Sequence, residues 1–377
     1  MDKLKVAIIF PYYAHYRKPV IDSLKDDVEI EYHFFGGQKE SPQFRGMKLI
    51  DMSVNDRFTK IENTWFLKYF SIQPGLSRKV KIANYNCVVI FGDWKYLSTW
   101  WVAIILRFRR VPTLFWSHGF RKNQNSFNDI FKTIYFKLFT GGLVFDQRAK
   151  DIFAEKGFKG DITVIYNSLD YKYQKSILEK VKEESTSIIS DEVPYILFSG
   201  RLTRTKNLDQ ILKAIAYLDN QGVFVKVVFI GEGEFKHELI RLSEELGIDA
   251  RVAFMGSCYD ERIIANCFLN AKASVIPSAV GLSAIHALTY GCPVITDDNN
   301  VKHGPEVAAI RDGVTGKIFI QGDIKDLAKK IASFTLLSQE ERDFYANNCI
   351  KEIESRYTAE NQRNLINLSI KKVVAKF

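Results

Sequence analysis

The chain has 377 residues, of which 46% are hydrophobic and 26% are charged, and its formal net charge is +9 at pH 7. This length favours two domains, and the apolar content is ample for two hydrophobic cores. No stretch approaches the 18 continuous apolar residues of a membrane-spanning helix, and the five cysteines are odd in number and lack metal-ligand spacing. We therefore expect a two-domain cytoplasmic protein with reduced thiols, without a spanning segment or a disulfide framework.

Short apolar runs with helical stretches between several of them fill the first half of the chain. The first run, Lys5 to Phe10, is typical of a buried strand and is too short for a signal peptide. Together with the runs that follow, it predicts an α/β domain over residues 1–170. The further expected strands are Glu29 to Phe35, Cys87 to Phe91, Thr113 to Ser117, Gly142 to Phe145 and Asp161 to Ile165.

Two loops after predicted strands of this domain carry candidate site residues. The loop from Pro11 to Pro19 contains His15, Tyr16, Arg17 and Lys18, and the loop from Trp116 to Lys122 contains His118 before a glycine. Ligands of open α/β sheets bind at the carboxyl ends of strands, which favours these positions. A single histidine is more often structural, and the two cations of the first loop are equally consistent with solvated side chains.

Positive charge is concentrated in the first half of the chain. Residues 1–180 hold 29 Lys+Arg and 18 Asp+Glu, or +11, which leaves 53 − 29 = 24 and 44 − 18 = 26, or −2, for the remainder. Most of the excess lies between Ser71 and Lys150, where cations alternate with aromatic residues, as in Trp94 to Tyr96 and Arg107 to Arg110. This mixture suits an anionic membrane surface. It would also suit a nucleic acid, which we do not expect as a partner, or amphipathic helices with aromatic core faces.

A polar segment follows the first domain and a second alternating region follows the segment. Residues 171–192 are interpreted as a linker, because few large apolar residues follow Ile177. Residues 193–355 form a second predicted α/β domain, and residues 356–377 a C-terminal helix, with helical periodicity from Ala359 to Val374. The strands expected in the second domain are Ile196 to Ser199, Lys226 to Ile230, Val252 to Met255, Ala273 to Ile276, Val294 to Thr296 and Gly316 to Phe319.

Three cations follow the first strand of the second domain. Gly200 ends that strand, and Arg201, Arg204 and Lys206 lie between it and the next helix. A guanidinium matches phosphate oxygens with a fork of donors and an ammonium is a compact point charge, so Arg201 and Lys206 are suited to neutralise a diphosphate. Surface loops often carry solvated basic residues, but the carboxyl end of a strand favours a ligand.

The segment from Ala273 to Thr296 predicts a strand, a turn, a helix and a second strand. The turn contains Pro277, Ser278 and Gly281, and the helix runs from Leu282 to Tyr290 before Gly291. Unpaired N–H groups at such a helix start, together with the helix dipole, favour an anion. Any βα unit of an α/β domain has the same pattern. The Asp297 to Asn300 cluster that follows is interpreted as a turn and not as a metal motif.

In this order, the segments resemble the GT-B glycosyltransferases, and in particular family four, the retaining nucleotide-sugar transferases. The resemblance covers most of the chain, and each motif is weak alone. The motifs are Ile165 to Asp170, Ser199-Gly200-Arg201 with Lys206-Asn207, Ile230 to Gly233, Phe254 to Gly256, Pro277-Ser278 through Ile295, and Glu306 with Asp312 to Gly316.

The resemblance implies two Rossmann-like domains facing a cleft, with the C-terminal helix returning to the first domain. It implies a metal-independent hexosyltransferase without a cofactor, which moves a sugar from a nucleoside-diphosphate sugar to a glycan or a polyprenyl-linked oligosaccharide with retained configuration. Bacterial surface polysaccharides such as O-antigen, capsule or lipopolysaccharide are the expected products. The expected location is the cytoplasm, with peripheral attachment at the inner face of the cell membrane.

The resemblance and the loop positions together assign roles to individual residues. Arg201, Lys206 and His118 are expected to be catalytic. The acceptor is expected to contact His15, Tyr16, Arg17 and Lys18. The donor is expected to contact Gly200, Gly231, Gly233, Ser257, Ser278, Val280, Gly281, Leu282, Ser283 and His286.

The chain departs from the family at two positions, where Ser278 and His286 replace the usual two glutamates. Both side chains can hydrogen-bond hydroxyls, but the carboxylate contacts of these positions are lost. A nucleotide-sugar epimerase of the same fold and a non-catalytic membrane- or anion-binding relative are the alternative functions. An NAD-dependent enzyme is disfavoured, because Gly231-Glu232-Gly233 lacks the third glycine of a dinucleotide fingerprint.

Overall fold

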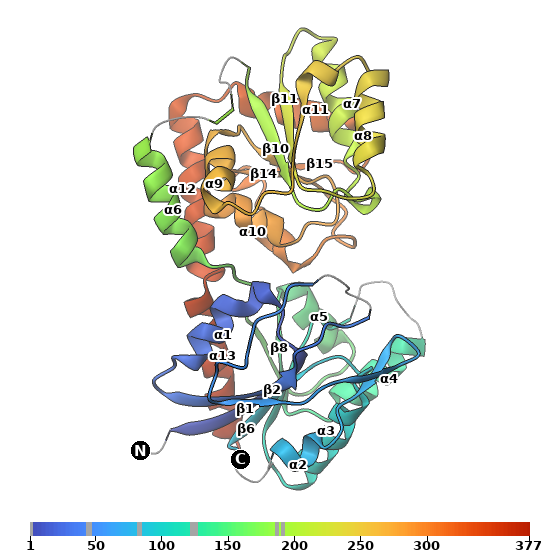
Figure 1. The fold of residues 1–377 in the computed structure, drawn as a ribbon, viewed down its shortest axis with the longest axis vertical. Coiled ribbons are helices and arrows are strands. Elements are labelled where there is room, and N and C mark those ends of the chain that lie inside the picture. The colour runs from blue at the N-terminus through green and yellow to red at the C-terminus, as the bar shows by residue number, and fades with distance from the viewer. Residues whose placement is uncertain (1–2, 43–46, 81–84, 121–126, 185–187, 190–192) are drawn as a thin grey trace. The chain divides into compact units, whose positions relative to one another are not determined.

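The computed structural model describes residues 3–42, 47–80, 85–120, 127–184, 188–189 and 193–377. The chain divides into two compact units. Unit 1 comprises Met1–Ser168 and Ala359–Phe377, and unit 2 comprises Leu169–Thr358. Each unit is a parallel sheet with helices packed against it (Figure 1).

Unit 1 contains a seven-stranded parallel sheet with the strand order β3-β2-β1-β6-β7-β8-β9. Its strands are β1 (Leu4–Tyr12), β2 (Ile30–Gly37), β3 (Phe58–Lys60), β6 (Cys87–Phe91), β7 (Thr113–Trp116), β8 (Gly141–Val144) and β9 (Asp161–Val164). The strands β4 (Thr64–Phe66) and β5 (Phe70–Ile72) form a separate antiparallel hairpin. The helices are η1 (His15–Arg17), α1 (Lys18–Lys25), α2 (Leu76–Val80), α3 (Leu97–Phe108), α4 (Phe127–Phe136), α5 (Gln147–Glu155) and α13 (Ala359–Val374).

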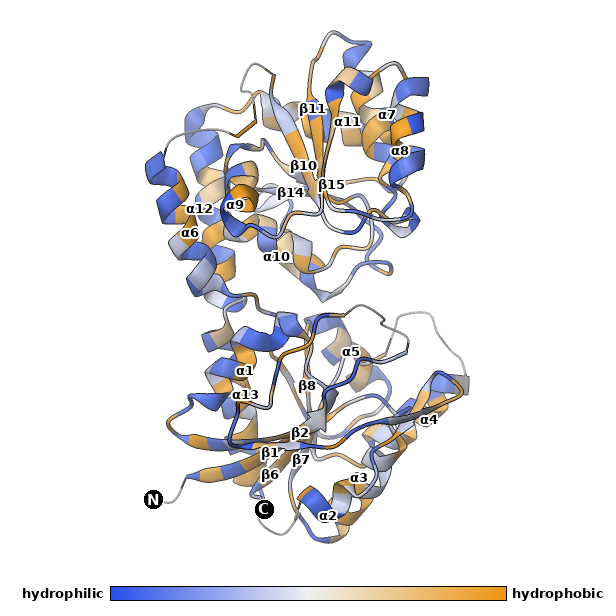
Figure 2. Cartoon of the chain, viewed as in Figure 1, coloured by the Kyte–Doolittle hydropathy of each residue, from blue (hydrophilic) through white to orange (hydrophobic). Residues whose placement is uncertain are grey.

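Alternation along the central strand places two hydrophobic cores on opposite faces of this sheet. Val6 and Ile8 of β1 pack in one core, to which α1 and α13 contribute. Ala7 and Ile9, which point the other way, pack in the second core with α3, α4 and α5. In Figure 2, the helices packed against this sheet carry both hydrophilic and hydrophobic residues. Buried residues on α13 recur at the spacing of one helix face, as in Ile366, Ile370 and Val373, which explains why this terminal helix belongs to unit 1.

Unit 2 contains a six-stranded parallel sheet with the order β12-β11-β10-β13-β14-β15. Its strands are β10 (Tyr195–Ser199), β11 (Lys226–Ile230), β12 (Val252–Gly256), β13 (Ser274–Val275), β14 (Val294–Asp297) and β15 (Gly316–Phe319). Its helices are α6 (Tyr171–Glu184), η3 (Arg204–Lys206), α7 (Asp209–Asp219), α8 (Lys236–Glu245), η4 (Asp249–Arg251), α9 (Glu261–Asn270), α10 (Leu282–Thr289), η5 (Pro305–Ala309), α11 (Ile324–Thr335) and α12 (Gln339–Arg356).

The linker predicted over residues 171–192 is wrong for most of its length, because α6 occupies Tyr171–Glu184. Its buried residues, Gln174, Ile177, Leu178 and Val181, follow the three- and four-residue spacing of one helix face. This face packs against α9, so a segment of polar composition is an amphipathic helix of unit 2. Residues 185–187 and 190–192 of the predicted linker lie outside the described residues.

Each sheet has one point at which the strand order reverses. In unit 2 the chain proceeds from β10 outward to β11 and β12, and then crosses to β13 on the other side of β10. In unit 1 the corresponding pair is β1 and β6. Loops diverge at such a point and leave a crevice at the carboxyl ends of the two strands. The segment with Lys206 follows β10 and the segment with Ser278 follows β13. Both predicted donor segments therefore lie where the strand order of unit 2 reverses, which we call its switch point.

Candidate functional site

Glycines allow two chain segments to touch at the carboxyl ends of β10 and β11. A Cβ on Gly231, whose φ is 140°, would lie 1.9 Å from the carbonyl oxygen of Gly200. A Cβ on Gly233 would lie 2.2 Å from the carbonyl oxygen of Leu202. No side chain fits in either place, so these predicted donor-site glycines have a structural requirement of their own. The close contacts of Gly231 with Gly200 and of Gly233 with Leu202 support the start of the segment that carries Arg201 and Lys206.

The three cations after β10 have different surroundings. Arg201 is exposed to solvent, whereas Arg204 pairs with Glu238. The Lys206 ammonium instead donates a hydrogen bond to the carbonyl oxygen of Ala279 on the loop after β13. Burial lowers the pKa of Lys206, and the positive charge of Arg201 lowers it further, although Glu306 acts in the opposite direction. The positive charges of Arg201 and Lys206 thus act on each other, and the negative charge of Glu306 balances them only in part.

The loop after β13 leads directly into the start of α10. Gly281 is the N-cap residue, its backbone is extended, and no side chain caps the helix. Among the described residues, the backbone N–H groups of Leu282 and Ser283 have no partner, as expected for the first turn of a helix. Ser278 is fully buried, and its hydroxyl has no hydrogen-bond partner in the described structure. The donor contacts predicted for Leu282 and Ser283 would therefore be made by backbone amides at a helix start, where an anion is stabilised.

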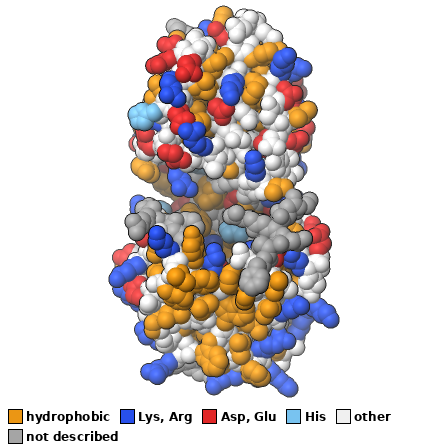
Figure 3. All heavy atoms as spheres, turned by 90° about the vertical axis from the view of Figure 1, so that its right-hand side faces the viewer, with side chains coloured by type: hydrophobic (Ala, Val, Ile, Leu, Met, Phe, Trp, Pro, Cys, Tyr) orange, Lys and Arg blue, Asp and Glu red, His pale blue; other side chains and the backbone are white. Residues whose placement is uncertain are grey.

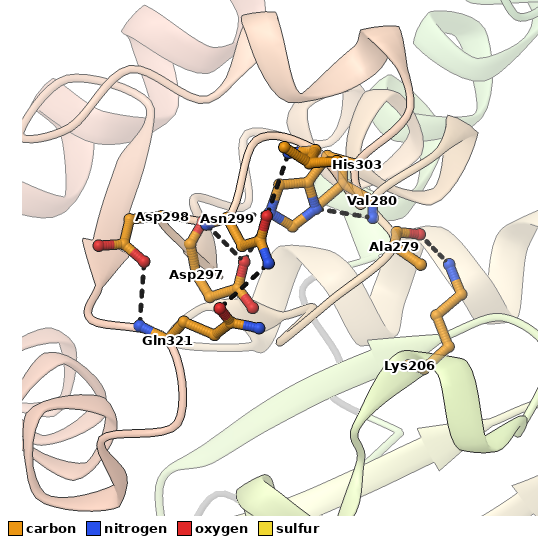
Figure 4. Close-up of polar contacts among 9 residues, drawn as sticks. Lys206, Ala279, Val280, Asp297, Asp298, Asn299, His303 and Gln321 are labelled. Carbon is orange, nitrogen blue, oxygen red and sulfur yellow. Dashed lines mark hydrogen bonds and ion pairs between the residues drawn. The ribbon is translucent and has the colours of Figure 1, made fainter. Parts of the chain in front are cut away.

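His303 and Asp297, which were not predicted as site residues, support this loop through hydrogen bonds (Figure 4). The Val280 amide donates to Nδ1 of His303 over 3.2 Å, and Nε2 of His303 lies 2.8 Å from Oδ1 of Asp297. The His303 and Asp297 side chains are both fully buried. Asp297 ends β14, the neighbour of β13, and the turn after β14 carries His303 back to the loop. The turn cluster at Asp297 to Asn300 is thus also the support of the candidate anion site.

His286 of α10 is partly buried and is bound to a carboxylate from another helix. Its Nε2 lies 2.6 Å from Oε1 of Glu261 at the start of α9. The same oxygen accepts hydrogen bonds from Tyr290 at 2.5 Å and from Gln174 of α6 at 3.0 Å. Burial alone would raise the pKa of Glu261, but the hydrogen bonds and the His286 interaction outweigh it and lower the pKa to about 2. Glu261 therefore supplies a carboxylate beside His286.

The remaining predicted donor residue, Ser257, is exposed and directly follows β12. Glu306, at the start of η5, is buried, and its carboxylate lies close enough to Gly304 that a Cβ there would be 2.6 Å from Oε2. Its charge also acts on Lys206. An acidic side chain therefore adjoins the cationic part of the site.

In unit 1, the loop after β1 contains a buried cation. Arg17 is only 7% exposed, and its guanidinium lies 5.3 Å from the ring centroids of Phe10 and Trp116 and 5.5 Å from that of Phe145. Among the described residues it has no ion pair with a carboxylate. Cation–π contacts offset part of the desolvation cost, but a buried charge without a counter-ion is expensive. This residue is therefore a stronger candidate for an anion site than its sequence context indicated.

The other predicted acceptor residues lie on the surface of the same loop. His15 and Tyr16 are exposed, and Lys18 pairs with Asp22 one turn further along α1. Partial burial lowers the pKa of His15, with smaller contributions from Lys48 and Lys18. Burial and these two lysines thus disfavour the protonated form of the imidazole.

His118 follows β7 on a loop with a fixed backbone. The Ser117 hydroxyl donates to the Gly92 carbonyl at 2.6 Å and accepts the Gly119 amide at 3.0 Å. The exposed His118 ring lies 4.5 Å from that of Phe145, which also contacts Arg17. The structure therefore brings His118 and Arg17 to the same aromatic side chain in unit 1. Arg121 and Lys122 of this loop lie outside the described residues.

Comparison with known proteins gives a family for the second half of the chain. The family described as "Glycosyl transferases group 1" matches residues 180–351. An uncharacterized 41.2 kDa protein in the cps region of Klebsiella pneumoniae is 29% identical over 47% of this chain and 47% of its own length. An uncharacterized glycosyltransferase of Methanocaldococcus jannaschii, MJ1607, is 26% identical over 53% of this chain and 51% of its own.

A third relative is named for its substrates. It is the N-acetylgalactosamine-N,N'-diacetylbacillosaminyl-diphospho-undecaprenol 4-alpha-N-acetylgalactosaminyltransferase of Campylobacter jejuni, 30% identical over 36% of this chain and 34% of its own length. Matches to these curated relatives span between about a third and a half of the relatives' length.

Solved structures resemble the whole chain. The apo form of the lipopolysaccharide outer core galactosyltransferase WaaB has a TM-score of 0.71 at 17% identity, covering 98% of this chain and 99% of its own. A glycosyltransferase from Rickettsia africae has a TM-score of 0.73 at 17% identity, covering 100% of both chains. Anabaena Alr3699/HepE in complex with UDP has a TM-score of 0.71 at 16% identity, covering 98% of this chain and 100% of its own. At these identities the likeness concerns the fold.

Proposed function

Because the chain is a GT-B protein of the glycosyl transferases group 1, with the family domain at residues 180–351, we propose that it is a retaining, metal-independent hexosyltransferase. In this proposal it transfers a sugar from a nucleoside-diphosphate sugar to a glycan or polyprenyl-linked acceptor in bacterial surface polysaccharide biosynthesis. The observation that carries the proposal is the pairing of Lys206 with the loop that begins α10, at the switch point of the sheet in unit 2.

The proposed chemistry places the diphosphate of the donor at the start of α10. The bond between the anomeric carbon and the phosphate oxygen breaks, the acceptor oxygen bonds to the anomeric carbon on the same face, and the acceptor proton passes to the leaving phosphate. Charge on the diphosphate increases in this step. Arg201, Lys206 and the amides of Leu282 and Ser283 therefore stabilise the transition state more than the bound donor.

Two features of the relatives support the donor and the acceptor class. HepE was solved with UDP, and the Campylobacter jejuni relative is named for a diphospho-undecaprenol acceptor. In this chain, Arg17 is buried and has no carboxylate partner among the described residues, and both Arg17 and His118 contact Phe145, so we assign the acceptor diphosphate to these residues. His15, Tyr16 and Lys18 belong to the same assignment as exposed neighbours of Arg17.

A lipid-linked acceptor requires the protein to reach a membrane, and one face of unit 1 is suited to this. Hydrophobic side chains gather over this unit in Figure 3. We call the surface formed by the β4–β5 hairpin, α3 and α4 the hairpin face. Its exposed apolar residues are Phe66, Leu67, Tyr69, Ile72, Leu97, Trp101, Phe108, Ile130 and Ile134. The elements are joined by the stacking of Trp94 on Phe131 and by a hydrogen bond from Arg107 to the Lys137 carbonyl at the ends of α3 and α4.

The turn between β4 and β5 has a backbone conformation that its residues, Leu67 and Lys68, normally disfavour. Leu67 and Lys68 have φ angles of 50° and 60°, in the left-handed region that hairpin turns normally fill with asparagine or glycine. Leu67 is nevertheless 77% exposed. A strained and exposed leucine indicates selection for something other than stability.

Charge on the hairpin face agrees with an anionic partner. From Thr64 to Arg110 the sequence has eight Lys or Arg residues and a single acidic residue, Asp93. Apolar side chains flanked by cations are the composition of a surface that rests on anionic lipids. In the described part of the chain, no helix is both long enough and apolar enough to cross a bilayer. The proposal is therefore peripheral attachment through the hairpin face.

Transfer is tested by incubating the full chain with a panel of nucleotide sugars and membrane extracts that contain lipid-linked oligosaccharides. The proposal predicts release of one nucleoside diphosphate and a product whose new linkage has the anomeric configuration of the donor, read by NMR. An inverted linkage would contradict the retaining mechanism. Conversion of the donor to an epimer without transfer would instead favour the alternative epimerase activity.

Membrane attachment is tested by sedimentation with vesicles of phosphatidylglycerol and phosphatidylcholine. Leu67→Ser removes a side chain whose burial contributes about 1.5–3 kcal/mol, so we expect binding to weaken at least roughly tenfold. Leu336→Ser is the matched control, because Leu336 is 81% exposed but belongs to unit 2. Equal binding of the wild type and Leu67→Ser would refute the assignment of this face. Vesicle binding that does not change with salt concentration or with the content of anionic lipid would also refute it.

A further inference from the structure

The loop that begins α10 is held at two consecutive residues by side chains and backbone from two other segments (Figure 4). Lys206 binds the Ala279 carbonyl, His303 accepts the Val280 amide, and the Gly304 amide donates to the Val280 carbonyl over 2.8 Å. Immediately after this clamp come Gly281 and the amides of the first turn of α10, which have no partner among the described residues. The direction of those amides therefore depends on the clamp.

The clamped loop has a backbone conformation that its own sequence does not favour. Ala279 has a φ of 49°, in the left-handed region that residues with a Cβ rarely occupy. Such a conformation persists only where surrounding contacts determine it, and it is typical of functional loops. The three contacts to Ala279 and Val280 are the ones that can do so here.

The hydrogen bonds of His303 define its tautomer. Nδ1 receives the Val280 N–H and so carries no proton. Nε2 lies 2.8 Å from Oδ1 and 3.1 Å from the carbonyl oxygen of Asp297, and both are acceptors, so Nε2 carries the proton. Asp297 thus fixes the neutral tautomer whose free nitrogen accepts the Val280 amide. Loss of Asp297 would free the proton to move to Nδ1, where it would repel the amide.

We infer that His303 is a positioning residue of the donor site, oriented by Asp297, which sets the direction of the α10 amides by accepting the Val280 N–H. The inference rests on the proposed function for the nature of the ligand, a nucleoside diphosphate. His303 itself is fully buried behind the loop and touches no ligand in this assignment. It acts only through Val280, so its removal changes binding of the diphosphate and not the proton transfers of the reaction.

Two substitutions separate the two ends of the imidazole. In His303→Asn, the amide oxygen takes the place of Nδ1 and can accept the Val280 N–H, but the side chain is too short for Asp297. In His303→Gln, the terminal nitrogen replaces Nε2 toward Asp297, and no acceptor remains for Val280. The two variants are similar in polarity and both must be accommodated in the same buried space, so each is the control of the other.

The first readout is affinity for UDP, GDP and ADP by calorimetry. The loss of one directing hydrogen bond corresponds to roughly tenfold weaker binding in His303→Gln, whereas His303→Asn should stay close to the wild type. The second readout is hydrogen exchange of the Val280 amide in the ligand-free full chain. It should be slow in the wild type and His303→Asn, and faster in His303→Gln.

The two readouts distinguish failure of this inference from failure of the proposed function. Wild-type affinity and slow Val280 exchange in His303→Gln would overturn the inference. Equal losses of thermal stability and affinity in both variants would also overturn it, because they would indicate a packing role. If the wild-type chain binds no nucleotide, the proposed function fails, while the exchange rates still decide whether His303 holds the loop.

Discussion

Removal of the Lys206 charge is the perturbation whose size can be worked most directly from the structure. The ammonium is bound to the loop of the candidate diphosphate site, and burial together with Arg201 lowers its pKa, which shows that the charge is held at a cost. At about 4 Å and an effective dielectric constant of about 20, one pair of unit charges interacts by roughly 4 kcal/mol. For Lys206→Gln, we therefore expect turnover to fall by about 10²- to 10³-fold, the range measured for one preorganised contact.

The assay is release of nucleoside diphosphate from the preferred nucleotide sugar, with the thermal unfolding temperature measured in parallel. Glutamine keeps a donor for the Ala279 carbonyl, so the loss reports charge more than loop structure. Arg204→Gln is the matched control, because Arg204 is a neighbouring cation that pairs with Glu238 and lies 5.2 Å from the ring centroid of Phe235. Its turnover should be unchanged. A Lys206→Gln protein with turnover within twofold of the wild type would refute the reasoning.

Two further predictions concern stability. Gly231→Ala should destabilise the fold by more than about 3 kcal/mol in urea unfolding, because the new Cβ would meet the Gly200 carbonyl, whereas Gly222→Ala, with open space around it, should cost about 1 kcal/mol; equal costs would contradict the close packing. Glu261 has a folded-state pKa of about 2, below the usual value near 4.3, so its stabilisation is complete above about pH 5 and lost as the pH falls toward 2. Unfolding free energies of the wild type and Glu261→Gln should differ by up to about 3 kcal/mol at pH 7 and converge on acidification; a constant difference would exclude this carboxylate as the source.

The fold, and the family domain at residues 180–351, were predicted correctly from the sequence, and the particular elements explain why. The buried strands are continuous apolar runs bounded by turn residues, so β1, β6 and β10 stand close to their predicted limits. The final helix has the predicted bounds, Ala359–Val374, because its apolar residues recur at helical spacing. Period and local composition suffice where an element is buried on both sides or on one regular face.

Elements without such a pattern were missed. The strand β3 and the β4–β5 hairpin have three residues per strand, too few for a period, and the hairpin turn at Leu67 lacks asparagine or glycine. The helix α6 was not predicted because its many charged residues are typical of a linker, although Ile177 and Val181 lie on its buried face.

The supports of the candidate site could not be found from local sequence for a different reason. Glu261 reaches His286 across 25 positions, and His303 reaches Val280 across 23. Both contacts depend on how neighbouring strand ends bring separate loops together. A local signal was a histidine three residues after the turn cluster that follows a strand end. Arg17 was named from its loop position, but its burial among aromatic rings is a property of the folded unit.

Binding of a nucleoside diphosphate to the cations after β10 is the central claim, and a thermal-shift experiment tests it most directly. The purified chain and its Arg201→Ala variant are unfolded in the presence of UDP, GDP, ADP or CMP. A diphosphate at 100 times its dissociation constant should stabilise the wild type by about 2.7 kcal/mol, and the variant should lose this shift. Absence of a shift with every nucleotide, or an equal shift in Arg201→Ala, would contradict the claim.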